Sequence, residues 1–282
     1  MTKAYVNRIA TAVPRHDVHA TFLRFAESLL GRTMRSGVFE RMAKRADIDH
    51  RYSFLEPAKT ANGPSVDAQG FYRRGDFPST AKRMRYFETH APELAAEAVG
   101  KLELGGERDS ITHLIVTCCT GLSAPGLDLE IVARCGLPQG IERTIIGFMG
   151  CYAAINALKL ARHIVRSDPD ARVLAVNLEL CTLHLQETPD LEKILSFLLW
   201  GDGCAAALIT AEPQGFELLD FRALIVPESR ELITWNVGDQ GFDMVLSGQV
   251  PAAIQTALGH CGQEILAGTK VEDVALWAVH PG

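Results

Sequence analysis

The sequence predicts an α/β protein built in layers, and three features support this prediction. From residue 111 onward, apolar runs of strand length alternate with helical patterns. The expected strands at 111–117, 143–148 and 172–178 are apolar almost throughout, which is typical of sheets covered by helices on both faces. The helix at 151–166 is rich in Ala, Leu and Ile and is apolar nearly all round, so we expect it to lie centrally between two layers.

The residues before this alternation are expected to be mostly helical and rich in loops. Apolar side chains recur at helical spacing in three segments, and Gly, Pro, Ser, Asn and Asp concentrate between two of them. Pro92 lies inside the third helical segment and should kink it. The expected elements are a strand at 5–12, helices at 19–30, 37–46 and 80–102, and a loop at 57–76.

The alternation continues less regularly to the end of the chain. A helix is expected at 126–135, strands at 203–210 and 216–226, a helix at 250–266 and a strand at 274–279. No exact internal repeat is present. The pattern predicts two α/β halves of unequal completeness, 1–210 and 211–282.

Composition excludes several classes of function. The 282 residues include 28 Lys and Arg against 34 Asp and Glu, which gives a formal net charge of −6. No basic stretch is long enough to follow a nucleic-acid backbone. No apolar stretch reaches the roughly 18–20 residues that span a bilayer, and the N-terminus lacks a signal-peptide pattern. We therefore expect a cytoplasmic protein without a nucleic-acid or membrane partner.

The seven cysteines do not predict disulfides or a metal centre. Their number is odd, their spacing is irregular, and no CxxC pair occurs. Most are expected to be small buried residues with free thiols, and no close Cys/His spacing fits tetrahedral zinc. We therefore expect no metal site.

Cys151 is the strongest candidate for a nucleophile. It lies in the run FMGCYAA at 148–154, where a strand ends, a Gly allows a tight turn, and a helix begins. A thiol at a helix N-terminus is exposed to the positive end of the helix dipole, which favours the thiolate. Taken alone, however, a cysteine is more often a small buried residue.

The rest of the chain decides between these interpretations. The FMGCYAA run resembles the active-site elbow of type III polyketide synthases, the chalcone synthase-like family. Four further segments resemble the same family in the same order: AKRM at 81–84 with APELA at 91–95, CTGLSAPG at 119–126, WGDGCAAA at 200–207 and WAVHPG at 277–282. Each motif is weak alone, but five in order over essentially the whole chain are specific.

The resemblance implies a thiolase-like layered αβαβα fold, with the second half incomplete here. It also implies a homodimeric acyltransferase that condenses an acyl-CoA starter with malonyl-CoA by decarboxylative Claisen chemistry. Cys151 would carry the acyl group as a thioester, and His280 would pair with its thiolate and later donate to the thioester oxygen. The reaction needs no cofactor beyond the two CoA substrates.

Other positions carry over from the family motifs. Trp200 occupies the place of a gatekeeper Phe at the cavity entrance, and Met244 that of a second gatekeeper. Arg41 and Arg45 match basic CoA-binding positions one helical turn apart, although a solvated helix face is the simpler interpretation. The remaining residues that the resemblance places around the cavity are Cys119, Glu179, Cys181 and His184. The departures from a plant chalcone synthase favour a bacterial-type enzyme that makes alkyl or aryl pyrones or resorcinols.

One catalytic position of the family has no counterpart. Family members continue beyond the His-Pro-Gly loop and include a catalytic Asn, whereas Asn156, Asn177 and Asn236 lie in unlike motifs. We therefore expect little condensation activity from the 282 residues alone. Two alternatives stay open: a ketoacyl-acyl carrier protein synthase of the fatty-acid initiation type, and a catalytically inactive thiolase-fold remnant.

Overall fold

The central element of the molecule is a mixed sheet. The computed structural model describes residues 2–31, 33–60 and 63–280, and within them the main sheet has the strand order β5-β4-β6-β7-β1-β8. β4 runs parallel to β5 and β6, whereas the pairs β6–β7, β7–β1 and β1–β8 are antiparallel. The strands are β1 (Tyr5–Ala12), β4 (His113–Cys118), β5 (Glu142–Gly147), β6 (Val173–Leu180), β7 (Asp202–Thr210) and β8 (Phe216–Glu217).

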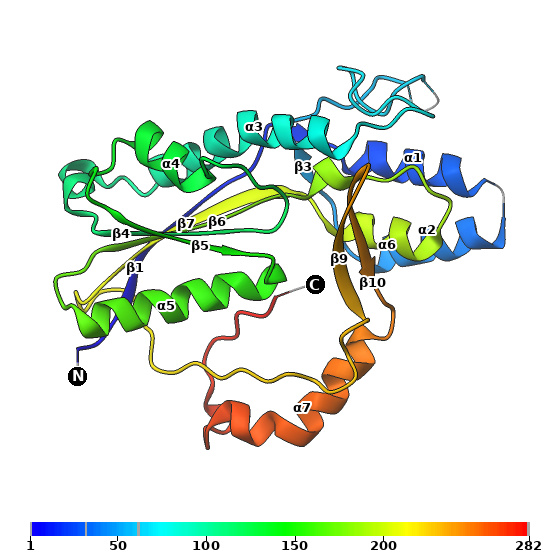
Figure 1. Cartoon of the computed structure of the whole chain (residues 1–282). Coiled ribbons are helices and arrows are strands. Elements are labelled where there is room, and N and C mark those ends of the chain that lie inside the picture. The colour runs from blue at the N-terminus through cyan, green and yellow to red at the C-terminus, as the bar shows by residue number, and fades with distance from the viewer. Residues whose placement is uncertain (1, 32, 61–62, 281–282) are drawn as a thin grey trace.

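Helices cover both faces of this sheet, as Figure 1 shows. α3 (Thr80–Gly100) and α4 (Leu127–Cys135) lie on one face, and α5 (Ala153–Ser167) lies on the other. α3 continues through Pro92 and buries Leu94 and its Ala neighbours against the sheet. The layered α/β prediction is therefore confirmed.

The prediction for α5 itself was wrong. Its buried residues form a single stripe, Ala153, Ala157, Ala161 and Val165, which packs on the sheet. Ile155, on another side of the helix, is exposed. The Ala, Leu and Ile content suggested a helix enclosed on all sides, but Lys, Arg and His residues at the intervening positions make it amphipathic.

A second group of helices lies beside the sheet. α1 (His19–Leu30), α2 (Met34–Arg45) and α6 (Leu191–Leu199) pack together and share the larger apolar core with α3. α6 was not predicted, although Asp190 caps it by accepting from two backbone N–H groups of its first turn. The two-residue strands β2 (His16–Asp17) and β3 (Tyr52–Ser53) pair next to this group.

The chain after β8 departs most from the prediction. The expected strand at 216–226 is reduced to β8, and the expected strand at 274–279 is an exposed extended segment that follows a short turn, η4 (Val271–Asp273). An apolar run forms a strand only when another strand is available to pair with it. Instead, β9 (Ile233–Gly238) and β10 (Gly241–Leu246) form an unpredicted hairpin, and α7 (Val250–Leu266) follows as expected.

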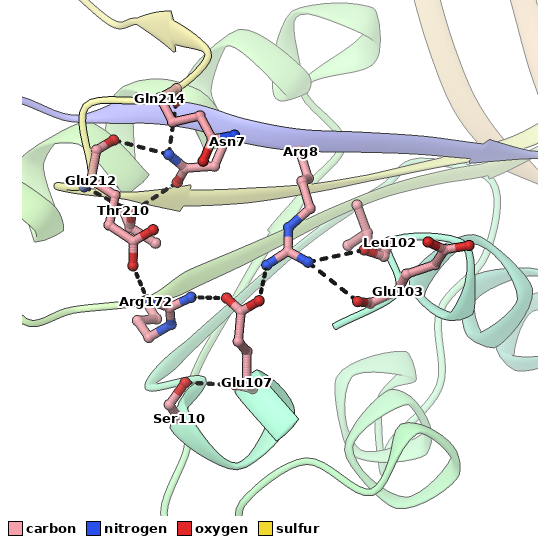
Figure 2. Close-up of polar contacts among 10 residues, drawn as sticks. All are labelled: Asn7, Arg8, Leu102, Glu103, Glu107, Ser110, Arg172, Thr210, Glu212 and Gln214. Atoms are coloured by element: carbon pink, nitrogen blue, oxygen red, sulfur yellow. Dashed lines mark hydrogen bonds and ion pairs between the residues drawn. The ribbon is translucent and has the colours of Figure 1, made fainter. Parts of the chain in front are cut away.

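Ion pairs connect residues of neighbouring strands and loops at one end of the sheet (Figure 2). Glu107, in the short helix η1 (Gly105–Ser110), binds both Arg8 of β1 and Arg172, which precedes β6. Arg172 also binds Glu212 at 2.7 Å, just after β7. These partly exposed pairs each contribute about 1 kcal/mol or less, so their role is to join the strand ends rather than to dominate stability.

Candidate active site

The candidate nucleophile lies where the chain turns from β5 into α5. Phe148 and Gly150 both have positive φ angles, 53° and 61°. Glycine adopts this backbone readily, but phenylalanine does not, so the turn holds Phe148 in a strained conformation. Its ring packs against that of Phe242, with the centroids 5.8 Å apart. The predicted strand-to-helix elbow is therefore present.

Cys151 differs from the other cysteines in its exposure. It occupies the single turn η2 (Gly150–Tyr152) directly before α5. All seven cysteines lie in the described part of the chain and have free thiols, and only Cys151 among them is exposed. Its position at the elbow makes it accessible to a substrate.

The predicted thiolate, however, does not match the electrostatics of the site. Partial burial raises the pKa of the Cys151 thiol, and the negative charge of Glu179 raises it further. The backbone N–H of Cys151 itself opposes this rise, but the pKa remains raised. The protonated thiol is therefore the resting form at neutral pH.

A half-buried carboxylate lies close to the elbow. The carboxylate of Glu179, on β6, accepts the backbone N–H of Cys119 at 2.9 and 3.0 Å and the hydroxyl of Thr120 at 2.6 Å. Burial raises the pKa of Glu179, while these hydrogen bonds oppose the rise. For the buried Cys119 thiol, burial and Glu179 likewise raise the pKa, although N–H groups of the elbow favour its thiolate. The Cys119 thiol therefore contacts the backbone of the elbow, and Glu179 holds Cys119 in place through its backbone N–H.

His184 connects the β9–β10 hairpin to the segment that contains Cys119 and Thr120. It ends the short helix η3 (Cys181–His184), donates from Nε2 to the Thr120 carbonyl at 2.7 Å, and accepts the Phe242 N–H at Nδ1 at 2.9 Å. Burial lowers the pKa of His184 to about 3, so the ring is neutral. The side chain has no exposed surface and therefore offers none to a substrate in this structure.

Trp235 joins the site without having been predicted. Its indole N–H donates to the Cys119 carbonyl at 2.8 Å, and its ring lies edge-on to those of His184, Trp200 and Phe242. The ring centroids of Trp235 and Trp200 are 6.0 Å apart. The only signal in the sequence is the hairpin, in which two apolar-rich strands flank the turn residues 239–240.

Two predicted residues, Cys181 and Trp200, line one largely apolar cavity. Burial raises the pKa of Cys181 well above the usual value, and nearby acidic groups raise it further. Cys151 is not among the lining residues. A negative charge on Cys151 would raise the pKa of the Cys181 thiol, so the two side chains lie within the range of electrostatic interaction. The apolar lining comes mainly from Val18, Phe22, Leu55, Val66, Leu185, Phe197 and Trp200, and the polar lining from Arg51, Asp67, Tyr72 and Thr182.

The other predicted residues are more dispersed. Met244 is half-buried on β10, directly opposite Trp235 of β9. Arg41 and Arg45 are exposed on α2. His280 is exposed near the end of the described chain, and the Pro and Gly that complete its motif lie outside the described residues.

No group of three or more His, Cys, Asp or Glu side chains within residues 2–31, 33–60 and 63–280 is arranged to hold a metal ion. No helix in those ranges combines the length and apolar character needed to cross a bilayer.

The layered α/β fold, with an exposed cysteine at a strand-to-helix elbow and a half-buried glutamate near its thiol, is typical of the thiolase-like class. Solved structures share the fold. Polyketide synthase PKS-I from the brown alga Ectocarpus siliculosus aligns with a TM-score of 0.88 and 26% identity, over 100% of this chain and 78% of that one. The 1,3,6,8-tetrahydroxynaphthalene synthase of Streptomyces coelicolor aligns with a TM-score of 0.83 and 22% identity, over 99% and 78%.

Sequence comparisons agree with this class. Residues 2–213 match the family model for the N-terminal domain of chalcone and stilbene synthases. The chain is 31% identical to the alpha-pyrone synthesis polyketide synthase-like Pks18 of Mycobacterium tuberculosis, over all of this chain and 72% of that protein. It is 32% identical to the bisdemethoxycurcumin synthase of Oryza sativa, over 86% of this chain and 63% of that protein. The chain therefore belongs to the chalcone and stilbene synthase family of type III polyketide synthases, and the predicted thiolase-like fold is confirmed.

Proposed function

We propose that the enzyme loads an acyl group from acyl-CoA onto Cys151 and extends it with malonyl-CoA to an alkyl or aryl pyrone or resorcinol. The observation that carries this proposal is the exposed Cys151 thiol at the elbow, close enough for its charge to act on Cys181, which lines an apolar cavity together with Trp200. An apolar wall suits the hydrocarbon part of a starter group. The proposal requires no cofactor or metal.

The reaction follows from thioester chemistry. The Cys151 sulfur attacks the carbonyl carbon of acyl-CoA, and coenzyme A leaves as its thiol. Malonyl-CoA then loses CO2, and the electron pair of the broken bond forms an enolate. The enolate carbon attacks the acyl thioester, the new carbon–carbon bond forms, and the Cys151 thiolate leaves.

The raised pKa of Cys151 makes proton removal an explicit requirement. Because the thiol is protonated at neutral pH, a base has to take its proton before attack. We assign this role to His280, which also suits donation to the enolate oxygen when protonated. Arg41 and Arg45, exposed on α2, are assigned to the phosphates of CoA.

The assembly that we propose is a cytoplasmic homodimer. β5 is an edge strand of the main sheet, and most of its residues are exposed, including Ile145. An open edge strand is a ready template for pairing with a second chain. Sedimentation should show a dimer, and Ile145→Lys should shift it toward monomer; a monomeric parent chain would contradict this part of the proposal.

The experiment for the reaction is a product assay. The chain is incubated with acyl-CoA starters of several lengths and with malonyl-CoA, and products are identified by mass spectrometry. Extended pyrones or resorcinols that are absent with Cys151→Ser support the proposal. Extension only from malonyl-acyl carrier protein would identify a ketoacyl synthase instead, and the absence of acylation of Cys151 by every acyl-CoA would contradict the proposal.

A further inference from the structure

Arg51 is a buried cation outside the residues assigned to the reaction. It directly precedes β3, is 6% exposed, and lines the same cavity as Cys181 and Trp200. Burial lowers the pKa of Arg51 to about 10, so the guanidinium is still charged at neutral pH. Because burial of a charge costs free energy unless hydrogen bonds replace those to water, the partners of Arg51 indicate its role in the fold.

The contacts of Arg51 converge on the segment that carries Trp200. Its Nη1 donates to the carbonyl of Trp200 at 2.7 Å and also to the carbonyl of Phe197. α6 ends at Leu199, so Phe197 lies in its last turn and Trp200 is its C-cap, and neither carbonyl has a partner within the helix. A guanidinium at this end also complements the negative end of the helix dipole.

Arg51 is itself fixed from the opposite side. Its Nε donates to Nδ1 of the buried His19 at 3.0 Å, and its guanidinium carbon lies 4.4 Å from the centre of the Phe22 ring. The Arg51 backbone N–H donates to the Asp17 carboxylate at 3.2 Å, and its carbonyl accepts the Val18 N–H at 2.7 Å. The side chain therefore has little freedom to follow a moving Trp200.

The backbone of Gly201, next to Trp200, lies very close to Arg51 and Tyr52. A Cβ atom added at Gly201 would lie 3.2 Å from the Tyr52 nitrogen and 3.4 Å from the Arg51 Cβ. Only a residue without a side chain permits this approach without displacement. The Trp200–Gly201 segment is thus held by two hydrogen-bonded carbonyls and by a close backbone contact.

We propose that Arg51 is a positioning residue that fixes the Trp200 indole as a wall of the acyl cavity and thereby sets which acyl chain lengths the enzyme accepts. The inference rests on the proposed function, because it assumes that the cavity holds the hydrocarbon part of the starter group. Arg51 does not touch the reacting atoms. Its loss should therefore alter selectivity between acyl groups more than the thioester chemistry common to all of them.

The test measures acylation of Cys151 by a ladder of straight-chain acyl-CoA thioesters, using intact-protein mass spectrometry. The variants are Arg51→Met, Arg51→Lys and Gly201→Ala, and the matched control is Arg134→Met, a surface arginine on α4 paired with Glu130. In Arg51→Met and Gly201→Ala, we expect the ratio of rates for long and short chains to change by about tenfold, the discrimination that one methylene provides in an apolar pocket. Arg51→Lys, which keeps the charge but not the forked donor, should change less.

A spectroscopic readout separates positioning from general destabilisation. The chain has three tryptophans, so 5-fluorotryptophan labelling gives three ¹⁹F signals, which single Trp→Phe variants assign. The Trp200 signal should shift or broaden in Arg51→Met and Gly201→Ala, while the exposed Trp277 should not change. Gly201→Ala changes the contact between the Trp200 segment and Arg51 without altering Arg51 itself. It therefore tests the inference if Arg51→Met does not fold.

The outcomes are distinguishable. A folded variant whose chain-length ratio or Trp200 signal matches that of the parent would overturn the inference. Equal slowing for every chain length would also overturn it, because that result indicates a loss of reactivity rather than of selectivity. No acylation of Cys151 in the parent chain would contradict the proposed function itself, and the inference would fall with it.

Discussion

The buried carboxylate of Asp202 should make the stability of the fold depend on pH. Asp202 opens β7 and is 5% exposed, and its two oxygens accept the backbone N–H and the hydroxyl of Thr182, each at 2.8 Å. Burial raises its pKa from 3.8 to about 7, against the opposing effect of hydrogen bonds from Thr182 and Ser53. The folded state therefore holds a proton that the unfolded chain releases near pH 4.

The sign and size of the effect follow from this difference. A raised pKa contributes stability that is complete below the unfolded value and is lost as pH rises toward the folded value. With a folded pKa of about 7 and 1.36 kcal/mol per pKa unit, the free energy of unfolding should fall by about 2–3 kcal/mol between pH 5 and pH 8 because of Asp202 alone.

Asp202→Asn isolates this contribution. The amide is neutral at every pH, its oxygen can still accept the Thr182 N–H, and its NH2 can donate to the Thr182 hydroxyl, which then turns toward Ser53. Urea unfolding followed by circular dichroism, at unit pH steps from 5 to 8, measures both proteins. The variant should gain about 2–3 kcal/mol relative to the parent across this range. A difference that is constant within the error of the extrapolation would refute the assignment of a protonated Asp202.

The remaining predictions concern the nucleophile, the core and the CoA site. Glu179→Gln removes a negative charge near the thiol, so the pKa of Cys151 should fall and alkylation by iodoacetamide at pH 8 should be faster; an unchanged or higher pKa would contradict the electrostatic account. Leu94→Ala deletes a fully buried side chain of α3 and should cost about 2–5 kcal/mol in urea unfolding; a loss below about 1 kcal/mol would mean that this core is not packed as described. Arg41→Gln with Arg45→Gln should raise KM for acyl-CoA about tenfold while leaving acylation by an acyl-N-acetylcysteamine thioester unchanged; equal effects on both donors would exclude phosphate binding.

Local patterns in the sequence predicted the elements that depend on local interactions. The strand–Gly–Cys–helix run fixes the elbow at Cys151, and the buried strands β4, β6 and β7 lie within two residues of their expected bounds. The strand expected at 274–279 did not form, because an apolar run needs a neighbouring strand as well as its own composition. The β9–β10 hairpin was missed because its turn, at 239–240, lacks the Asn-Gly or Asp-Gly pair that signals a tight hairpin.

Interactions between distant residues account for the other differences. The state of Cys151 depends on Glu179, which comes from another strand, and on the extent of burial, so a pattern around the cysteine could not predict a raised pKa. Trp235 contacts Cys119 across more than a hundred residues, and Arg51 reaches the end of α6 in the same way. The resemblance to the family supplied candidate positions, but only the fold shows which of them meet.

The most direct test of the central claim is the site of acylation. The parent chain and Cys151→Ser are incubated with a long-chain acyl-CoA, and peptides are mapped by mass spectrometry under conditions that preserve thioesters. We predict a single acyl group on Cys151 in the parent and none in the variant. An acyl group on any other cysteine, or equal labelling of both proteins, would contradict Cys151 as the nucleophile.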